Sequence, residues 1–392
     1  VVGVPERIEH APPALRQRAT LLAADHPLPG ERSLAAARAV RDFVATIAGN
    51  ETLLALISGG GSAHLTLPAR ELTLDDLRVV TGALQRAGAP IDDLNCVRRH
   101  CELLKGGRLS MLSHAKAVQC LVLSDVVGDR LDVIASGPFT PDPTTYDDAL
   151  AVLARYGAID TAPAVTAHLR RGAEGLFEDT PPPGSPHFTG VRHIIVGNNR
   201  LALDALGSAC IDAGFRVLDA RHAVTGDAAA LGADLASRAL RCAPIAAEHA
   251  RPVALLLGGE WTVDTAGATG VGGPSQELAL AAAITLHRAA RDAGQRSEAP
   301  PRVGVLTFST DGVDGPTDAA GAIVTERTIA DPRALVPNGA SVLDADAALR
   351  RHDSHVVLDA RGALLRTGPT GTNVNHVAAA VVFPPGAEPR PG

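Results

Sequence analysis

Short apolar runs that end in glycine or acidic residues alternate with helical segments along this chain, and this alternation constrains the fold most. Residues 53–58 (LLALIS) run directly into Gly59, and residues 117–124 (AVQCLVLS) run into an acidic loop. Runs of this length are typical of strands buried on both faces of a parallel sheet. Further runs predict strands at residues 193–196, 215–218, 253–257, 303–309, 356–358 and 377–382.

Helices are expected between these strands. Apolar spacing and end signals predict them over residues 74–88, 143–155, 200–213, 228–241 and 275–291. Thr73 and Asp75 are placed to cap the first of them. The order of elements predicts an α/β protein with mostly parallel sheets flanked by helices. In such sheets, ligands bind outside the carboxyl ends of the strands.

Chain length and one linker-like segment predict two domains. At about 150 residues per domain, 392 residues suggest two or three. Residues 243–252 (APIAAEHARP) are the best linker candidate. We therefore expect a larger N-terminal domain over residues 1–245 and a smaller C-terminal domain over residues 251–392.

Composition excludes several classes of protein. The net charge of −7 argues against a nucleic-acid binder. No run of 18 apolar residues predicts a membrane span. The scattered cysteines form no CxxC pair and favour a reducing compartment, so we expect a cytoplasmic protein. They are Cys96, Cys101, Cys120, Cys210 and Cys242.

Two loops and a basic segment in the first half are candidates for chemistry. Ser58 to Ser62 includes three adjacent glycines, Gly59, Gly60 and Gly61, whose N–H groups could hold anionic oxygens or simply form a turn. Asp125 and Asp129 could bind Mg²⁺, or equally cap turns. The segment between these loops concentrates positive charge and suggests an anionic partner or a solvated face. It contains Asn95, Arg98, Arg99, His100, Lys105 and Arg108.

The second half has three more loops of this kind. Gly259 and Glu260 follow a predicted strand, and a glycine-rich stretch then leads to the helix near Ser275. That helix start is a candidate anion site, and Glu260 a metal or hydroxyl ligand, although a long hairpin would fit as well. Asp311 opens an acidic loop that is richer in carboxylates than a turn requires. Asn373 lies in a compact polar loop near the end.

Eight segments, taken in order, resemble the glycerate 2-kinase family, whose members are often named hydroxypyruvate reductase. The resemblance covers nearly the whole chain, from Asp25 to Asn375. The segments are LISGGGSA (56–63), NCVRRH with KGGRL (95–109), LSDVVGDRLDVIASGP (123–138), DPTTYDDAL (142–150), VGNNRLAL (196–203), GGEWTV (258–263), TDGVDGPTDAAGAIV (310–324) and GPTGTNVN (368–375).

The resemblance implies a Rossmann-like N-terminal glycerate kinase domain and a C-terminal MOFRL domain. It also implies ATP-dependent, Mg²⁺-assisted phosphorylation of the 2-hydroxyl of D-glycerate to 2-phosphoglycerate, in a cleft between the domains. The expected partners are glycerate and a nucleotide, with a homodimer as one assembly and neither nucleic acid nor a membrane involved.

Residue roles follow from the same resemblance. Lys105, Asp311 and Arg98 are expected to be catalytic, with Asp311 orienting the hydroxyl or a metal. Asp125, Asp129 and Glu260 are expected to handle Mg²⁺. The expected substrate or phosphate contacts are Ser58, Gly59, Gly60, Gly61, Ser62, Asn95, Gly259 and Asn373.

The sequence departs from the family pattern in two main places. Family members carry a strand, a GAGK-type loop and a helix upstream of the position of Val1, so we expect that this part is missing from the sequence or absent from the protein. The family's GKGGRNQE reads GVGGPSQE at residues 270–277. Pro274 cannot supply the guanidinium of the family arginine, but it suits the first turn of a helix. Arg99 and Trp261 are smaller departures.

Two other functions stay open. A hydroxypyruvate reductase should contain a G-x-G-x-x-G strand–helix turn, and this sequence shows no such unit. A catalytically weakened relative that binds a nucleotide or hydroxy acid is favoured modestly by Pro274 and by the missing lysine loop.

Overall fold

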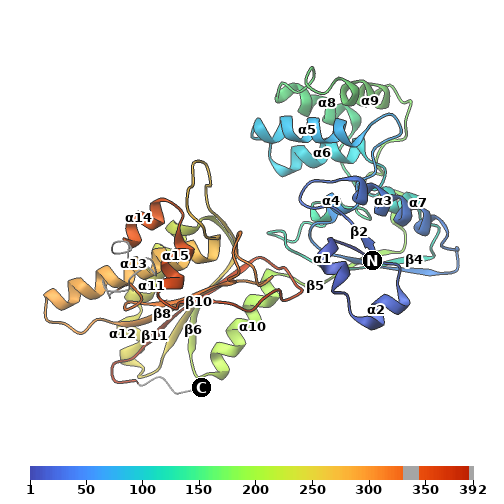
Figure 1. Cartoon of the computed structure of the whole chain (residues 1–392). Helices are drawn as coiled ribbons and strands as arrows, with labels where there is room; N and C mark the ends of the chain where they lie inside the picture. Colours follow the sequence, from blue (N-terminus) through green and yellow to red (C-terminus); the bar gives the residue numbers. More distant parts are fainter. Residues whose placement is uncertain (330–343, 388–392) are drawn as a thin grey trace. The chain divides into compact units, whose positions relative to one another are not determined.

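The computed structural model describes residues 1–329 and 344–387, which form two compact units that divide between Val196 and Gly197. Figure 1 shows both units coloured along the chain. Each unit combines strands with flanking helices, which confirms the predicted α/β class.

Unit 1 contains a two-stranded parallel sheet, β1–β2, and a three-stranded sheet of order β3-β4-β5, in which β3 and β4 are parallel. The three predicted strands of this unit are confirmed as β3, β4 and β5. Its strands are β1 (Val2–Gly3), β2 (Leu22–Ala23), β3 (Thr52–Ile57), β4 (Ala117–Leu123) and β5 (Val191–Gly197). Its helices are α1 (Pro5–Glu9), α2 (Pro13–Arg18), α3 (Glu31–Ala45), α4 (Gly61–His64), α5 (Leu74–Arg86), α6 (Ile91–Cys101), α7 (Arg108–Leu112), α8 (Tyr146–Arg155) and α9 (Pro163–Ala173), with short 3₁₀ turns at Ile134–Ser136 and Pro186–Phe188.

Two hydrophobic clusters hold unit 1 together. One fills the space between α5, α6, α8 and α9 and includes Leu84, Leu153 and Leu169. These four helices group together in Figure 1. The other lies between the sheet and α3 and α7. Thr73 caps α5 as predicted: its hydroxyl accepts the N–H of Asp76, and its own N–H donates to the carboxylate of Asp76. The predicted second cap, Asp75, instead pairs with Arg78.

Unit 2 contains a six-stranded sheet of order β10-β9-β8-β11-β7-β6. Only β6 and β7 pair in parallel, and the other pairs are antiparallel. The prediction of mostly parallel strands therefore does not hold for this sheet, because β11 lies between β7 and β8. Its strands are β6 (Arg216–Asp227), β7 (Val253–Thr262), β8 (Arg302–Ser309), β9 (Gly321–Thr325), β10 (Leu364–Leu365) and β11 (His376–Phe383). Its helices are α10 (Asn199–Asp212), α11 (Ala228–Arg241), α12 (Ala243–Glu248), α13 (Pro274–Gln295), α14 (Ala345–Arg350) and α15 (Ser354–Ala360).

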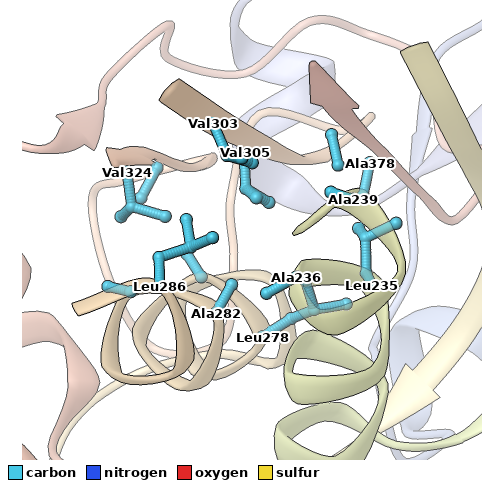
Figure 2. Packing of buried hydrophobic residues seen from close by; sticks show 14 of the residues in the cluster. Leu235, Ala236, Ala239, Leu278, Ala282, Leu286, Val303, Val305, Val324 and Ala378 are labelled. Atoms are coloured by element: carbon cyan, nitrogen blue, oxygen red, sulfur yellow. The ribbon is translucent and has the colours of Figure 1, made fainter. Parts of the chain in front are cut away.

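The main core of unit 2 lies between this sheet and the helices α11 and α13. Figure 2 shows Leu235 of α11 and Leu278 of α13 facing Val305 of β8. Small side chains, such as Ala236 and Ala282, let the two helices pack closely over the sheet. On the opposite face, α10 covers β7 and β11 through a smaller cluster that includes Leu203. Aliphatic and alanine side chains thus form a core with few aromatic residues.

Two predicted segments differ in the structure. Residues 356–358 were expected to form a strand and lie in α15, because Val357 and Leu358 face the core as part of a helical turn. The linker candidate at residues 243–252 mostly forms α12, which packs Ala246 into the core.

The compact units divide at Val196 and Gly197, whereas the predicted domain boundary falls at residues 246–250, inside unit 2. The difference arises because β6 pairs with β7 and α11 packs against α13. Residues 197–245 therefore share a sheet and a core with the rest of unit 2.

Within the described ranges, no helix has both the length and the apolar character needed to cross a membrane.

Candidate functional site

The glycine loop after β3 is shaped by close packing in unit 1. A Cβ atom on Gly59 would lie 1.8 Å from Oδ2 of Asp125, so the carboxylate at the end of β4 rests directly on this glycine. Gly60 has a φ of 79° and adjoins the rings of His26 and His64. Glycine is therefore required here for the close approach of other side chains and for a left-handed turn.

Ser62 belongs to a buried chain of hydrogen bonds. Its Oγ lies 2.8 Å from Oγ of Ser136, which in turn donates to Oδ1 of Asn95 at 3.1 Å. Ser136 and Asn95 are almost completely buried. Three consecutive residues, Ala135, Ser136 and Gly137, have left-handed φ values of 52°, 58° and 65°. Two non-glycine residues in that conformation carry backbone strain, which is common at functional sites.

Lys105 is a buried anchor for this loop. Its ammonium donates to the carbonyls of Ser62 and Leu65 at 2.8 and 2.9 Å and to Oε2 of Glu102 at 2.7 Å. An ammonium has three protons, and all three have acceptors within the protein. Burial lowers the pKa of Lys105, against the opposing charge of Glu102. The structure thus gives Lys105 a positioning role, and its predicted direct contact with substrate stays a prediction.

Arg98 lines a cavity in unit 1 with a volume of about 610 Å³. The cavity is also lined by Gly60, Ser62, Glu102 and residues 26–29. Arg98 is half-buried, and within the described part of the chain its guanidinium has no hydrogen bond or ion pair. Burial lowers its pKa, although the charge of Glu102 opposes that effect. A partly desolvated guanidinium without a partner is suited to bind a carboxylate or phosphate.

The carboxylates expected to handle Mg²⁺ do not form a closed metal site. Burial raises the pKa of Asp125, against its own backbone N–H and the charge of His26. Asp129 lies in a turn with a φ of 55° and donates its N–H to the carbonyl of Val126. Across residues 1–329 and 344–387, no three His, Cys, Asp or Glu side chains gather around a metal position.

In unit 2, several predicted loops meet at one edge of the sheet. β6, β7 and β8 run in the same direction, because β6 is parallel to β7 while β11 is antiparallel to both β7 and β8. His376, the first residue of β11, lies opposite Gly259 on one side and Ser309 on the other. Glu260, near the end of β7 and opposite Thr225 of β6, therefore lies at the same end of the sheet as the loops that contain Asp311 and Asn373.

Asp311 is held in a fixed orientation at this edge. Its Oδ1 accepts hydrogen bonds from the hydroxyl of Ser309 at 2.9 Å and from the N–H of Val313 at 3.0 Å. Its carbonyl accepts the N–H of Thr370, which ties the acidic loop to the polar loop near the end. Asn373 is exposed and accepts the N–H of Asn375. The structure thus brings Asp311 and the loop of Asn373 together.

Gly259 and Glu260 have different surroundings. A Cβ atom on Gly259 would lie 2.0 Å from the carbonyl oxygen of Val224, so glycine is needed for the close approach of β6. Glu260 is exposed, but it lies within β7 and not in a loop after the strand, as the sequence predicted, because β7 continues its pairing with β6 to Thr262. Packing alone therefore explains Gly259, and its predicted substrate contact stays a prediction.

The anion site predicted at the start of α13 is wrong, because a carboxylate of the protein occupies it. Asp314 accepts the N–H groups of Ser275 and Gln276 at 2.9 and 2.8 Å. Burial raises the pKa of Asp314 to about 6, against these hydrogen bonds. Pro274 stands in the first turn of α13, as expected for a residue that needs no hydrogen-bond acceptor there.

Sequence reasoning assigned no role to Ser136 or to the pair of His376 and Trp261. The rings of His376 and Trp261 stack at 4.9 Å, and Nδ1 of His376 is buried without a partner among the described residues. Burial lowers the pKa of His376 to about 4, despite the charge of Asp311. His376 follows the TNVN segment directly, a position that could have marked it as a site residue.

The predicted residues thus gather into two groups. Unit 1 holds Ser58 with the glycine loop, Arg98, Lys105 and Asp125, and unit 2 holds Gly259, Glu260, Asp311 and Asn373. Ser58 itself is exposed and has no role in the hydrogen-bond chain around Ser62.

Comparison with known proteins places both units in one family. Residues 1–170 match the model of a domain of unknown function, DUF4147, and residues 253–376 match the MOFRL family. Glycerate 2-kinase of Pyrococcus horikoshii is 35% identical over 93% of this chain and 78% of its own length. D-glycerate 2-kinase of Thermotoga maritima is 37% identical over 92% and 79%, respectively. A putative hydroxypyruvate reductase of Agrobacterium vitis is 37% identical over 96% and 80%.

A solved structure agrees with these matches. The crystal structure of glycerate kinase from Thermotoga maritima superposes with a TM-score of 0.79 and 36% sequence identity, covering 93% of this chain and 81% of that one. Sequence and structure therefore show that the chain belongs to the glycerate 2-kinase family.

Proposed function

We propose that this protein transfers the γ-phosphoryl group of ATP to the 2-hydroxyl of D-glycerate, with Mg²⁺, and releases 2-phosphoglycerate. The observation that carries the proposal is the cavity of about 610 Å³ in unit 1, where Arg98, which has no hydrogen bond among the described residues, lines the same space as Gly60 and Ser62. A small carboxylate of three carbons fits this volume. Two of the most similar relatives are named glycerate 2-kinase and D-glycerate 2-kinase.

In this proposal, Arg98 binds the carboxylate of glycerate, since a guanidinium matches a carboxylate through paired N–H donors. Lys105 holds the carbonyls of Ser62 and Leu65, and thereby fixes the loop on which the substrate rests. Phosphoryl transfer depends mainly on positioning and on charge stabilisation, which these residues supply.

Asp311 is proposed to orient the attacking hydroxyl or to hold the metal. One of its oxygens is fixed by Ser309 and Val313, which leaves the other for a ligand. Asp125 is proposed to bind Mg²⁺, since its carboxylate lies against Gly59 of the glycine loop. Burial raises its pKa, and a bound cation would favour its ionised form. When bound, Mg²⁺ neutralises the charge of the phosphates. The cleft expected between the domains stays a prediction.

A coupled assay with ATP, Mg²⁺ and D-glycerate tests the proposal. Enolase and pyruvate kinase convert 2-phosphoglycerate to pyruvate. Pyruvate formed without added phosphoglycerate mutase therefore identifies the product as 2-phosphoglycerate. If pyruvate forms only when the mutase is added, the product is 3-phosphoglycerate instead. The absence of phosphorylated product would refute the proposal.

Two further assays on the same protein test the other two functions. NADH oxidation with hydroxypyruvate would favour the reductase, the name that two of the relatives carry. Nucleotide binding by calorimetry without turnover would favour a weakened relative, which the replacement of the family arginine by Pro274 makes a specific alternative.

A further inference from the structure

A second cavity of unit 1, with a volume of about 540 Å³, concentrates positive charge. Its lining residues include more arginines than carboxylates, although the whole chain has a net charge of −7. The arginines are Arg38, Arg41, Arg70 and Arg78, and the carboxylates are Glu31 and Asp75. The proposed function uses none of these residues.

Two of the four guanidinium groups already have partners inside the protein. Arg41 and Arg78 each bind an aspartate of their own helix, at 2.7 and 2.9 Å. Arg78 also donates to the carbonyl of Pro29. Arg38 and Arg70, in contrast, make no hydrogen bond or ion pair with any residue that the structure describes. The cavity therefore has two guanidinium groups that are free to bind a ligand.

The local structure places both free arginines at the cavity. Arg38 and Arg41 are three residues apart on α3, so they lie on the same face of that helix. Arg70 follows a segment that is tied to the end of α6, where the N–H of Ala69 donates to the carbonyl of Cys101 at 2.9 Å. The two arginines thus reach one cavity from separate, fixed pieces of backbone.

The charges and the lining of the cavity indicate the class of ligand. A guanidinium presents paired N–H donors that match two oxygens of a phosphate or carboxylate. A ligand with two or more negative charges neutralises both free arginines, whereas a monocarboxylate neutralises only one. Buried leucines on the same wall reduce the water near a bound anion, which strengthens its attraction to the arginines. They are Leu67, Leu72 and Leu74.

We propose that this cavity binds the phosphate groups of a small phosphorylated molecule, which Arg38 and Arg70 hold. The inference goes beyond the proposed function and does not depend on it, because the cavity is distinct from the one that Arg98 lines. Among the described residues, Arg78 alone lines both cavities. Arg78 is therefore left unchanged in the test.

Calorimetric titration of inorganic pyrophosphate into the full chain, at low and constant ionic strength without Mg²⁺ or nucleotide, tests the inference. We expect saturable binding to the unchanged protein. Arg38→Gln and Arg70→Gln should each weaken it about tenfold, the effect of losing one charged hydrogen-bonding partner. Glu31→Gln should strengthen binding about twofold or more, because it removes a negative charge from the cavity.

Arg86→Gln is the matched control. Arg86 is also exposed, lies on α5 and lines neither cavity, so its substitution removes the same charge from another place. It should change the affinity by less than about twofold. The melting temperatures of the variants should agree, since Arg38, Arg70 and Arg86 are all exposed.

Three results would overturn the inference. They are the absence of saturable binding, an equal effect of Arg86→Gln and of the two cavity variants, and a loss of binding in Arg98→Gln alone, which would place pyrophosphate in the other cavity. Because the titration involves no turnover, the expected affinities would support the inference even if the protein failed to phosphorylate glycerate. A working kinase without these affinities would support the activity and refute the inference.

Discussion

Asp311 shows how one side chain can be both fixed and available. Ser309 and Val313 hold one carboxylate oxygen, and the other has no hydrogen bond within the described residues. Asp311→Asn keeps the size of the side chain but removes its charge and its ability to accept a proton. We expect kcat/KM for glycerate to fall by about 10²- to 10³-fold, a typical range for such a group.

Steady-state kinetics with ATP, Mg²⁺ and D-glycerate measure this effect. Asp318→Asn is the control, because Asp318 lies in the same loop but is exposed and paired with Arg366. It should leave kcat/KM nearly unchanged. A value within twofold of the unchanged protein for Asp311→Asn would rule out the proposed role.

Lys105 and Glu102 form a buried ion pair in which each charge neutralises the other. Lys105→Met leaves the carboxylate of Glu102 buried and unpaired, and it leaves two carbonyls without their donor. We expect the free energy of unfolding to fall by about 3–5 kcal/mol, as for other broken buried pairs. Adding Glu102→Gln should restore part of that loss, because the unpaired charge is then gone.

Urea unfolding measures both variants. Lys116→Met is the matched control, since Lys116 is the other lysine of the chain and is exposed. Its substitution should change the free energy by less than about 0.5 kcal/mol. An equally small change for Lys105→Met would show that the pair contributes little.

Asp314 illustrates what the sequence could not reveal at the scale of residues. The glycine-rich stretch before Ser275 predicted a free helix start, and Asp314 is 39 residues further along the chain. Only the fold brings its carboxylate to the N–H groups of α13. Ser136 was given no role for the same reason, because its partners Ser62 and Asn95 are distant in sequence.

At the scale of elements, strong local patterns predicted most strands and helices. The apolar runs at 53–58 and 117–124 became β3 and β4, and residues 228–241 form α11 as expected. The run at 356–358 was too short to distinguish a strand from a helical turn, and tertiary packing decided for α15. The antiparallel insertion of β11 between β7 and β8 could not be predicted, because it depends on long-range pairing.

The end of α6 (Ile91–Cys101) and the Pro/Gly-rich segment after α9 are joined by His100 and Asp179, at 2.9 Å. Burial lowers the pKa of His100, but Asp179, the carbonyl of Cys96 and the charge of Asp142 together raise it to about 9. In the unfolded chain, the pKa of histidine is about 6.5. The pair therefore stabilises the fold fully below about pH 6.5, and this contribution is lost as the pH rises through about 9.

We expect the free energy of unfolding to decrease from pH 6.5 to 9 by about 1–2 kcal/mol through this pair, since Asp179 is 38% exposed and partly screened. In Asp179→Asn, the decrease should be much smaller. Glu178→Gln, at the exposed neighbouring position, should keep the full decrease. Urea titrations at several pH values compare the three proteins, and parallel curves for all of them would contradict the assignment.

At the scale of the whole molecule, each compact unit has cores of its own. The clusters of unit 1 involve α3, α5, α6, α7, α8 and α9, whereas those of unit 2 lie on the two faces of the six-stranded sheet. The division at Val196 and Gly197 could not be predicted from composition, because the linker-like residues 243–252 fold as α12. The predicted number of two domains is confirmed. Long-range pairing of β6 with β7 determines that residues 197–245 belong to unit 2.

Because each unit has a core of its own, a cavity made in one core should destabilise that unit alone. Leu169→Ala in α9 and Leu278→Ala in α13 each remove a fully buried side chain, one from each unit. Each should cost its own unit about 2–5 kcal/mol. For units of nearly 200 residues, this corresponds to a shift of roughly 4–20 °C in melting temperature. In calorimetry, each variant should lower one unfolding transition and leave the other near its original temperature. If either variant lowered every transition by the same amount, the two units would unfold as one cooperative body, and the separate cores would not act as independent centres of stability.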